Sequence, residues 1–355
     1  LYNNMSNNYR VLIAYCSREK DVVQKAFLDG GVKREDLFHF STSKRMLFIP
    51  LLLRLRKLFI AESVDIVHTF FLHSDILGCV AAFGAGVNRL ISTVEGQIVL
   101  DEVHGVNKAK QLCYSVLNRI VRPHFYKTIA VSAQLKSELI QNHSGEEDKV
   151  EVFNIGIDIP SEEEINIDSR DDKKEKVIAA AARFSKDKQL EYLIKVIPDV
   201  VREVPQARFI IAGRGDEEKN LRQQADDLNV QSYVSFPGWI EDTKKLMREI
   251  DVLVITSLRE GSPMALSEAL SFSKSVVAFN VPGIKEVICS GEDGLLAEPF
   301  DLKQFSTFII KVCKDHEYAK MLGKNGRKKA EAMLSSRMEN KKLEALYAEL
   351  LNVHP

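Results

Sequence analysis

The sequence predicts an α/β protein made of two doubly wound domains, whose parallel sheets face each other across a cleft. Short runs rich in β-branched residues alternate with amphipathic, helix-like segments along most of the 355 residues. That alternation is typical of parallel sheets covered by helices. The chain is also too long for most single cores. Residues 160–176 are highly charged with few apolar side chains, which indicates a solvated linker between two domains.

The expected strands follow from these apolar runs. In the first half they are residues 9–16, 64–70, 89–94, 127–132 and 149–156, and in the second half residues 176–184, 207–213, 232–238, 251–257 and 275–280. We therefore expect a first domain over residues 1–160 and a second over residues 161–337. A helix over residues 338–355 is expected to complete the first domain. Ligands of such sheets bind at the carboxyl ends of the strands.

Composition limits the classes of function. The formal net charge is −1, so a strongly basic nucleic-acid binder is not favoured. The five cysteines form no CxxC pair and therefore signal neither a disulfide framework nor a zinc site. No apolar run reaches the length of a membrane span. Together these features predict a cytoplasmic protein in a reducing compartment.

The stretch "REGSPMALSEAL" at residues 259–270 follows a run that reads as a buried strand. Ser262 suits a helix N-cap and Pro263 the first helical position, so a helix is expected to begin there. Backbone N–H groups from Gly261 to Met264 then lie at a partly positive helix terminus, where an anion such as phosphate can bind. An ordinary capped helix explains this stretch equally well when it is taken alone.

Charged residues flank the expected helix start. Glu260 precedes the helix and Glu268 lies inside it, and carboxylates suit hydroxyl-rich groups on either side of a phosphate. Arg183 and Lys188 follow the first strand of the second half, where cations could neutralise a diphosphate leaving group. The Gly-x-Gly turn that begins at Gly213 is weak evidence, because a tight turn between strand and helix explains it equally well.

Several segments resemble, in order and spacing, the retaining glycosyltransferases of family four, whose fold is called GT-B. They are "RFSKDK" (183–188), "IIAGRGDEEKNL" (210–221), "VSFPGWIED" (234–242), "DVLVITSLREGSPMALSEAL" (251–270), "VPGIKEVI" (281–288) and "EDGLLAEP" (292–299). The spacing from Glu260 to Glu268 matches the E-x7-E motif of that family. The similarity covers nearly the whole chain and is strongest over residues 176–300.

The resemblance implies a nucleotide-sugar donor, with a UDP-sugar favoured, bound by the second domain without a metal or another cofactor. It assigns Arg183 and Lys188 to the diphosphate, Glu260 to sugar hydroxyls and Glu268 to the ribose. The implied catalytic residues are Glu260, Arg183 and Lys188, and the implied donor-binding residues are Glu268, Gly261, Ser262, Pro263, Met264, Gly213 and Trp239. The reaction would transfer a sugar, with retention, to a saccharide or lipid-linked acceptor in cell-surface polysaccharide synthesis.

The first half agrees with the family more loosely. Glu95 stands where the family usually has a His near the donor sugar. His68, His73 and Asp75 lie after an expected strand and could contact the acceptor, although a structural histidine is an equally good explanation. A non-catalytic nucleotide-sugar-binding subunit and a sugar-nucleotide epimerase of similar architecture are the alternatives. The E-x7-E segment argues against the epimerase.

Two further features of the first half lead to expectations. The apolar and basic segment 44–63, interrupted by Pro50, would either touch an anionic membrane surface on its cytoplasmic side or pack into the core as a helix. Its basic residues are Lys44, Arg45, Arg54, Arg56 and Lys57. Residues 9–16 look like the second strand of the family's first domain, so the first strand and its Gly-rich loop are expected to be missing. Either the sequence is truncated or the first domain is shorter.

Overall fold

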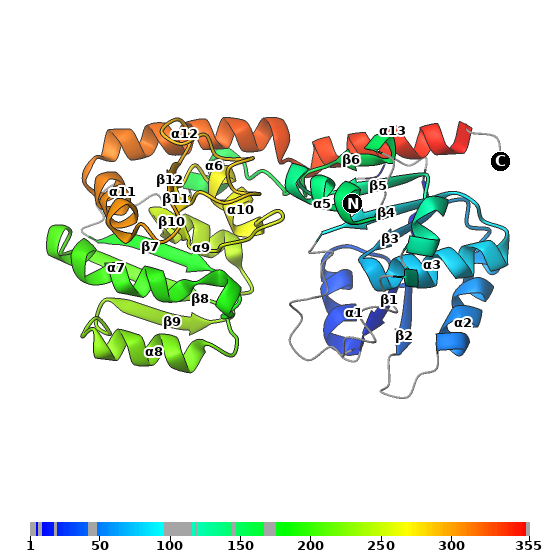
Figure 1. Ribbon diagram of the computed structural model, residues 1–355, viewed down its shortest axis with the longest axis horizontal. Coiled ribbons are helices and arrows are strands. Elements are labelled where there is room, and N and C mark those ends of the chain that lie inside the picture. The colour runs from blue at the N-terminus through cyan, green and yellow to red at the C-terminus, as the bar shows by residue number, and fades with distance from the viewer. Residues whose placement is uncertain are drawn as a thin grey trace. The chain divides into compact units, whose positions relative to one another are not determined.

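The computed structural model describes residues 5, 9–17, 20–41, 48–95, 116–117, 119–143, 147–166 and 175–352. The chain divides into two compact units. Figure 1 colours the chain by residue number, from blue at the N-terminus to red at the C-terminus. Unit 1 comprises Leu1–Phe153 together with Ser336–Pro355, and unit 2 comprises Asn154–Ser335. The boundaries expected from the sequence, at residues 160 and 337, lie a few residues further along the chain.

Unit 2 contains a six-stranded parallel sheet in the order β12-β11-β10-β7-β8-β9. Its strands are β7 (Lys176–Ala181), β8 (Ala207–Ala212), β9 (Val234–Gly238), β10 (Val252–Ile255), β11 (Ser275–Phe279) and β12 (Leu295–Ala297). Its helices are α6 (Glu162–Asn166), α7 (Leu190–Glu203), α8 (Glu218–Asp227), α9 (Thr243–Glu249), α10 (Met264–Ser271), α11 (Leu302–Lys314) and α12 (His316–Met333), with a 3₁₀ turn, η6, over Lys186–Lys188. Every residue of β10 and β11 is buried, as in parallel strands covered on both faces.

The chain order reverses in the middle of this sheet. Strands β8 and β9 follow β7 on one side, whereas β10, β11 and β12 extend on the other side. Strands β7 and β10 are therefore neighbours at a topological switch point. In open parallel sheets the crevice at such a point, beside the carboxyl ends of the strands, is where ligands bind.

Part of the expected linker is ordered. Residues of the segment 160–176 form helix α6, which begins with a capping box: the Ser161 hydroxyl accepts from the Glu164 N–H, and the Glu164 carboxylate accepts from the Ser161 N–H. Residues 167–174 of the same segment lie outside the described residues.

Unit 1 contains two parallel sheets, one of strands β1 (Ile13–Ser17) and β2 (Leu37–Ser41) and one of four strands in the order β3-β4-β5-β6. The latter strands are β3 (Val67–Phe70), β4 (Leu90–Val94), β5 (Lys127–Ala130) and β6 (Val150–Val152). The helices are α1 (Lys20–Asp29), α2 (Phe48–Ala61), α3 (Leu72–Ala85), α5 (Ala133–His143) and α13 (Ser336–Asn352), with 3₁₀ turns η2 (Arg34–Asp36), η4 (Arg122–His124) and η5 (Glu147–Lys149). That a first strand of the family is missing stays a prediction.

Helix α2 corrects one expectation. Pro50 lies within its first turn, where the missing N–H would have no helical partner, so the proline does not interrupt the helix. Leu51, Leu55 and Phe59 pack into the core of unit 1. Lys44 and Arg45 lie outside the described residues. None of the helices in the described part of the chain is both long and apolar enough to cross a membrane.

Helix α13 belongs to unit 1 although it follows unit 2 in the sequence. Its residues Leu343, Leu346 and Leu350 join one buried cluster with Ile91 of β4 and Ile129 of β5. The helix therefore covers the four-stranded sheet with the apolar face that its periodicity predicts.

Candidate functional site

An ion pair lies at the switch point of the unit 2 sheet. Lys188 ends the 3₁₀ turn after β7, and its Nζ lies 2.8 Å from Oε1 of Glu260, in the loop after β10. The two side chains are only 16% and 12% exposed. The hydroxyl of Thr256 donates to the carbonyl oxygen of Lys188 at 2.8 Å, which ties the two loops together. A cavity of about 30 Å³ beside the pair is large enough for about one water molecule.

The start of helix α10 differs from the expectation. The helix begins at Met264, and the N-cap residue is Pro263, with φ −70° and ψ 107° and no capping hydrogen bond from a side chain. Ser262 as N-cap was therefore wrong, because the extended ψ of Pro263 moves the first helical residue further along. The N–H groups of Met264 and Ala265 lie in the first turn, where no helical carbonyl accepts from them. The start of the helix thus keeps the donors that suit an anion.

Glu268 lies half-buried on α10, and a hydroxyl holds its carboxylate. Thr243, the first residue of α9, donates from Oγ1 to Oε1 of Glu268 at 3.0 Å. Burial raises the pKa of Glu268, while the hydrogen bond from Thr243 and the charge of Lys244 act in the opposite direction. Sequence reasoning missed Thr243. Its only signal is its place directly after Asp242, which caps α9 by accepting from the Lys245 N–H.

Two glycines shape the loop that carries Arg183. Gly213 and Gly215 follow β8 with φ of +143° and +156°, and a Cβ at either would collide with a carbonyl oxygen, that of Ala182 or that of Phe184. Glycine is required here so that the turn after β8 can lie against the loop after β7. This gives Gly213 a packing role, and its contact with a donor stays a prediction.

The turn after β11 packs closely against the backbone of Glu260. Gly283 has φ +82°, and a Cβ there would collide with the carbonyl oxygen of Glu260. Arg183 and Trp239 complete the same sheet edge, since they follow β7 and β9, and both are exposed. Unit 2 therefore gathers its expected site residues at the carboxyl ends of neighbouring strands.

The expected acceptor residues of unit 1 are placed differently. The imidazole of His68, in β3, is bonded through Nδ1 to the Tyr347 hydroxyl at 2.6 Å and through Nε2 to the Thr93 hydroxyl at 2.7 Å. Burial lowers the pKa of His68 to about 3. Both ring nitrogens are already used, which favours a structural histidine. The side chain of His73 lies outside the described residues.

Asp75 is 1% exposed and lies inside a polar network. The hydroxyls of Thr69 and Ser92 donate to its Oδ1 at 2.5 and 2.8 Å, and the Arg122 guanidinium lies 3.4 Å from its Oδ2. Burial raises the pKa of Asp75, and these partners oppose the rise. These contacts favour a structural role for Asp75 over contact with an acceptor.

Glu95 directly follows β4 and is half-buried. Burial, together with the nearby charge of Glu339, raises the pKa of its carboxyl group. Glu95 therefore lies at the carboxyl end of a strand, where ligands of parallel sheets bind, and it stays a candidate for contact with the acceptor.

The unit 2 edge can hold an anion flanked by hydroxyl groups. Arg183, Lys188 and the start of α10 supply positive charge and N–H donors, while Glu260 and Glu268 accept hydrogen bonds. Among the described residues, no group of three or more His, Cys, Asp and Glu could hold a metal ion.

Comparison with known proteins gives a consistent result. The family described as "Glycosyl transferases group 1" matches residues 161–329, and "Glycosyltransferase Family 4" matches residues 4–160. An Escherichia coli protein named UDP-Gal:alpha-D-GlcNAc-diphosphoundecaprenol alpha-1,3-galactosyltransferase is 26% identical over 316 residues, covering 82% of this chain and 80% of the relative. The capsular polysaccharide biosynthesis glycosyltransferase CapM of Staphylococcus aureus is 26% identical over 329 residues, covering 90% of this chain and 84% of the relative.

Among solved structures, HepE of Anabaena in complex with UDP has a TM-score of 0.77 at 21% identity, covering 92% of this chain and 89% of that one. At this identity the likeness shows the fold alone. The two family matches, the ordered segments and the shared fold agree. The chain therefore belongs to the family-four glycosyltransferases, a retaining family with the GT-B fold.

Proposed function

We propose that this enzyme transfers a sugar from a UDP-sugar, with retention, to a saccharide or lipid-linked acceptor in cell-surface polysaccharide synthesis. The observation that carries the proposal is the Lys188–Glu260 pair at the switch point of the unit 2 sheet. The E. coli relative is named for UDP-Gal and a diphosphoundecaprenol acceptor, and the S. aureus relative for capsular polysaccharide. These names support the donor and the acceptor class.

The proposed role of each residue follows from its charge: cations bind the diphosphate and carboxylates bind hydroxyl groups. Arg183 and Lys188 neutralise the diphosphate as it leaves, with the N–H groups at the start of α10 as further donors. Glu260 accepts from hydroxyls of the transferred sugar, and Glu268 accepts from the ribose. Trp239 lies beside the base. No step requires a metal, because the cations and the helix start stabilise the leaving group.

An acceptor with a lipid anchor would place the enzyme at the cytoplasmic face of a membrane. Helix α2 supports such a contact: Ile49 and Leu53 are exposed, and the helix sequence contains Arg54, Arg56 and Lys57 but no acidic residue. Exposed apolar side chains beside basic ones suit the surface of an anionic bilayer. Co-sedimentation with anionic vesicles, lost in Leu53→Glu, is the expected outcome.

Thermal unfolding in the presence of UDP, GDP and UDP-sugars tests the donor. A ligand that binds only the folded chain raises the unfolding temperature by mass action. We expect UDP to stabilise the wild type. Glu268→Gln should weaken UDP binding by about tenfold, because the amide keeps the Thr243 bond but loses the charge-assisted bonds to the ribose. Glu163→Gln, an exposed position on α6, is the matched control.

The outcomes separate the possibilities. A UDP shift that Glu268→Gln reduces and Glu163→Gln keeps supports the donor site. If GDP raises the unfolding temperature and UDP does not, the proposed UDP-sugar donor is wrong. A folded wild type that no nucleotide stabilises contradicts the donor site. Transfer or slow hydrolysis of the bound UDP-sugar then measures the reaction itself.

A further inference from the structure

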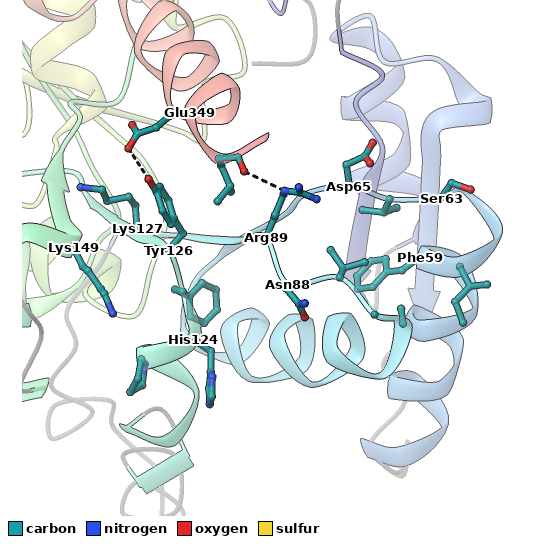
Figure 2. Close-up of a pocket in the computed structure, with 18 of the residues that line it drawn as sticks. Phe59, Ser63, Asp65, Asn88, Arg89, His124, Tyr126, Lys127, Lys149 and Glu349 are labelled. Atoms are coloured by element: carbon teal, nitrogen blue, oxygen red, sulfur yellow. Dashed lines mark hydrogen bonds between the residues drawn. The ribbon is translucent and has the colours of Figure 1, made fainter. Parts of the chain in front are cut away.

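A pocket lies in unit 1, at the amino ends of its strands. Its volume is about 860 Å³, and Figure 2 shows the side chains around it. Arg89 directly precedes β4, Lys127 begins β5, and Lys149 directly precedes β6. Catalytic crevices of such sheets lie at the opposite, carboxyl ends. A strand of five residues separates the two edges by roughly 15 Å, so this amino-edge pocket is distinct from the edge that carries Glu95.

Hydrogen bonds fix the walls of the amino-edge pocket. The Tyr126 hydroxyl donates to the Glu349 carboxylate at 2.6 Å, and Nε of Arg89 donates to the carbonyl oxygen of Leu350 at 3.1 Å, as Figure 2 shows. Both bonds attach the sheet to helix α13. The pocket is therefore framed by segments that are far apart in sequence: the end of α2, the segments before β4, β5 and β6, and α13.

The charges that line the pocket balance. Its cationic side chains are Arg89, Lys127 and Lys149, and its carboxylates are Asp65, Asp148 and Glu349. Nζ of Lys127 already lies 3.0 Å from the Glu151 carboxylate and donates to the carbonyl oxygen of Asp148. A multiply charged anion such as a nucleoside diphosphate would gain little from this lining, because three carboxylates share the pocket with the three cations.

The lining suits a neutral ligand with one apolar and one polar face. Ile60, Val64 and the 9% exposed Phe59 contribute apolar side chains to the lining, and Figure 2 shows the rings of Tyr126 and His124 on the side opposite Phe59. An edge-to-face contact with Phe83, with ring centroids 4.9 Å apart, holds the His124 ring. Asn88 is exposed at the pocket and offers both a donor and an acceptor.

We propose that the amino-edge pocket binds a neutral oligosaccharide of about two or three sugar units. A pyranose presents C–H groups on one face, which pack on aromatic rings, and hydroxyls at its edge, which bond to amides and carboxylates. The volume lies within the range of pockets that hold drug-sized molecules. The site goes beyond the proposed donor chemistry and does not depend on a nucleotide.

Saturation-transfer NMR and calorimetry with the full chain test the proposal, with maltotriose, tri-N-acetylchitotriose and mannotriose as probes at millimolar concentration. We expect at least one trisaccharide to bind, with unchanged affinity when UDP is saturating. Asn88→Trp should weaken binding at least tenfold, because the indole fills the pocket. Asn88→Ala should weaken it about fivefold through the lost hydrogen bonds. Gln134→Trp, at an exposed position of α5 outside the pocket, should bind like the wild type.

Three results would overturn the proposal. The first is that none of the three trisaccharides binds the folded wild type. The second is binding that survives both Asn88 variants. The third is binding that UDP abolishes or that Glu268→Gln weakens, since the sugar would then occupy the donor edge of unit 2. If Asn88→Trp does not fold, Asn88→Ala combined with Asp65→Asn gives the same comparison. Failure of UDP to bind concerns the proposed function only and leaves this test intact.

Discussion

The Lys188–Glu260 pair allows a double-mutant cycle that tests whether these residues act as one unit. Lys188→Met keeps the apolar stem and removes the ammonium, while Glu260→Gln keeps the shape and removes the charge. Lys188→Met leaves the Glu260 carboxylate without its ammonium partner, and Glu260→Gln leaves Lys188 with only the more exposed Asp187 carboxylate, 3.9 Å away. The double variant removes both charges.

The magnitude follows from the burial of the pair. Breaking a fully buried pair by removing one partner costs about 3–5 kcal/mol, because the remaining charge stays desolvated. Here the side chains keep 16% and 12% exposure, and water near each should reduce the cost to about 2 kcal/mol. We expect a coupling free energy of about 1.5 kcal/mol, with the double variant hardly less stable than either single one.

Urea unfolding of the four proteins, followed by far-UV circular dichroism and by a second probe to check for two-state behaviour, measures the free energies. UDP affinity gives an independent readout. Lys188→Met should weaken UDP binding by about tenfold, whereas Glu260→Gln should leave it nearly unchanged, because UDP lacks the transferred sugar whose hydroxyls Glu260 is proposed to bind. Strictly additive destabilisation by the two single changes would refute the coupling, and equal UDP affinity in both would refute the assigned roles.

Three further comparisons test features of the fold. Gly283→Ala should lower the free energy of unfolding by at least about 2 kcal/mol and weaken UDP-sugar binding, because the new Cβ displaces Glu260. Gly291→Ala, at φ +89° with open space around it, should lower the free energy of unfolding by only about 1 kcal/mol. Urea unfolding compares the two variants. Gln189 has φ +50°, so Gln189→Gly should be about 1 kcal/mol more stable than Gln189→Ala in the same assay. Burial lowers the pKa of His68 from 6.5 to about 3, so between these values the unfolded chain takes up a proton that the folded chain does not. The contribution of neutral His68 to the stability of the fold is therefore complete above pH 6.5 and is lost as the pH falls towards 3. Between pH 6 and 4 the wild type should lose about 1 kcal/mol more per pH unit than His68→Gln.

Local sequence patterns predicted most of the sheet of unit 2. The runs at 252–255 and 275–279 are short, apolar and rich in β-branched residues, and buried parallel strands require that composition. Strand β2, "LFHFS", was not predicted, because its alternation is short and includes a histidine. Strand β12 has only three residues, and its pairing with β11 is a tertiary contact that no local pattern encodes.

Sequence patterns predicted which charged residues form the candidate site, but not which side chains contact one another there. The strand-to-helix positions of Lys188, Glu260 and Glu268 follow from local patterns and from the resemblance. The pairing of Lys188 with Glu260 joins residues far apart in the chain, as does the Thr243–Glu268 bond. No local pattern in one sequence encodes either contact. The left-handed φ of Gln189 is likewise not encoded by its residue type, because glycine is the residue that adopts this conformation at no steric cost.

The place of helix α13 has a consequence for synthesis of the chain. Unit 2 is one continuous segment, so all its strands and helices are available once the ribosome has made residue 335. Unit 1 begins earlier but cannot bury Ile91 and Ile129 until Leu343, Leu346 and Leu350 emerge. Its sheet must therefore remain partly uncovered while the whole of unit 2 is translated. The nascent first half is then the part of the polypeptide most exposed to chaperones and to aggregation.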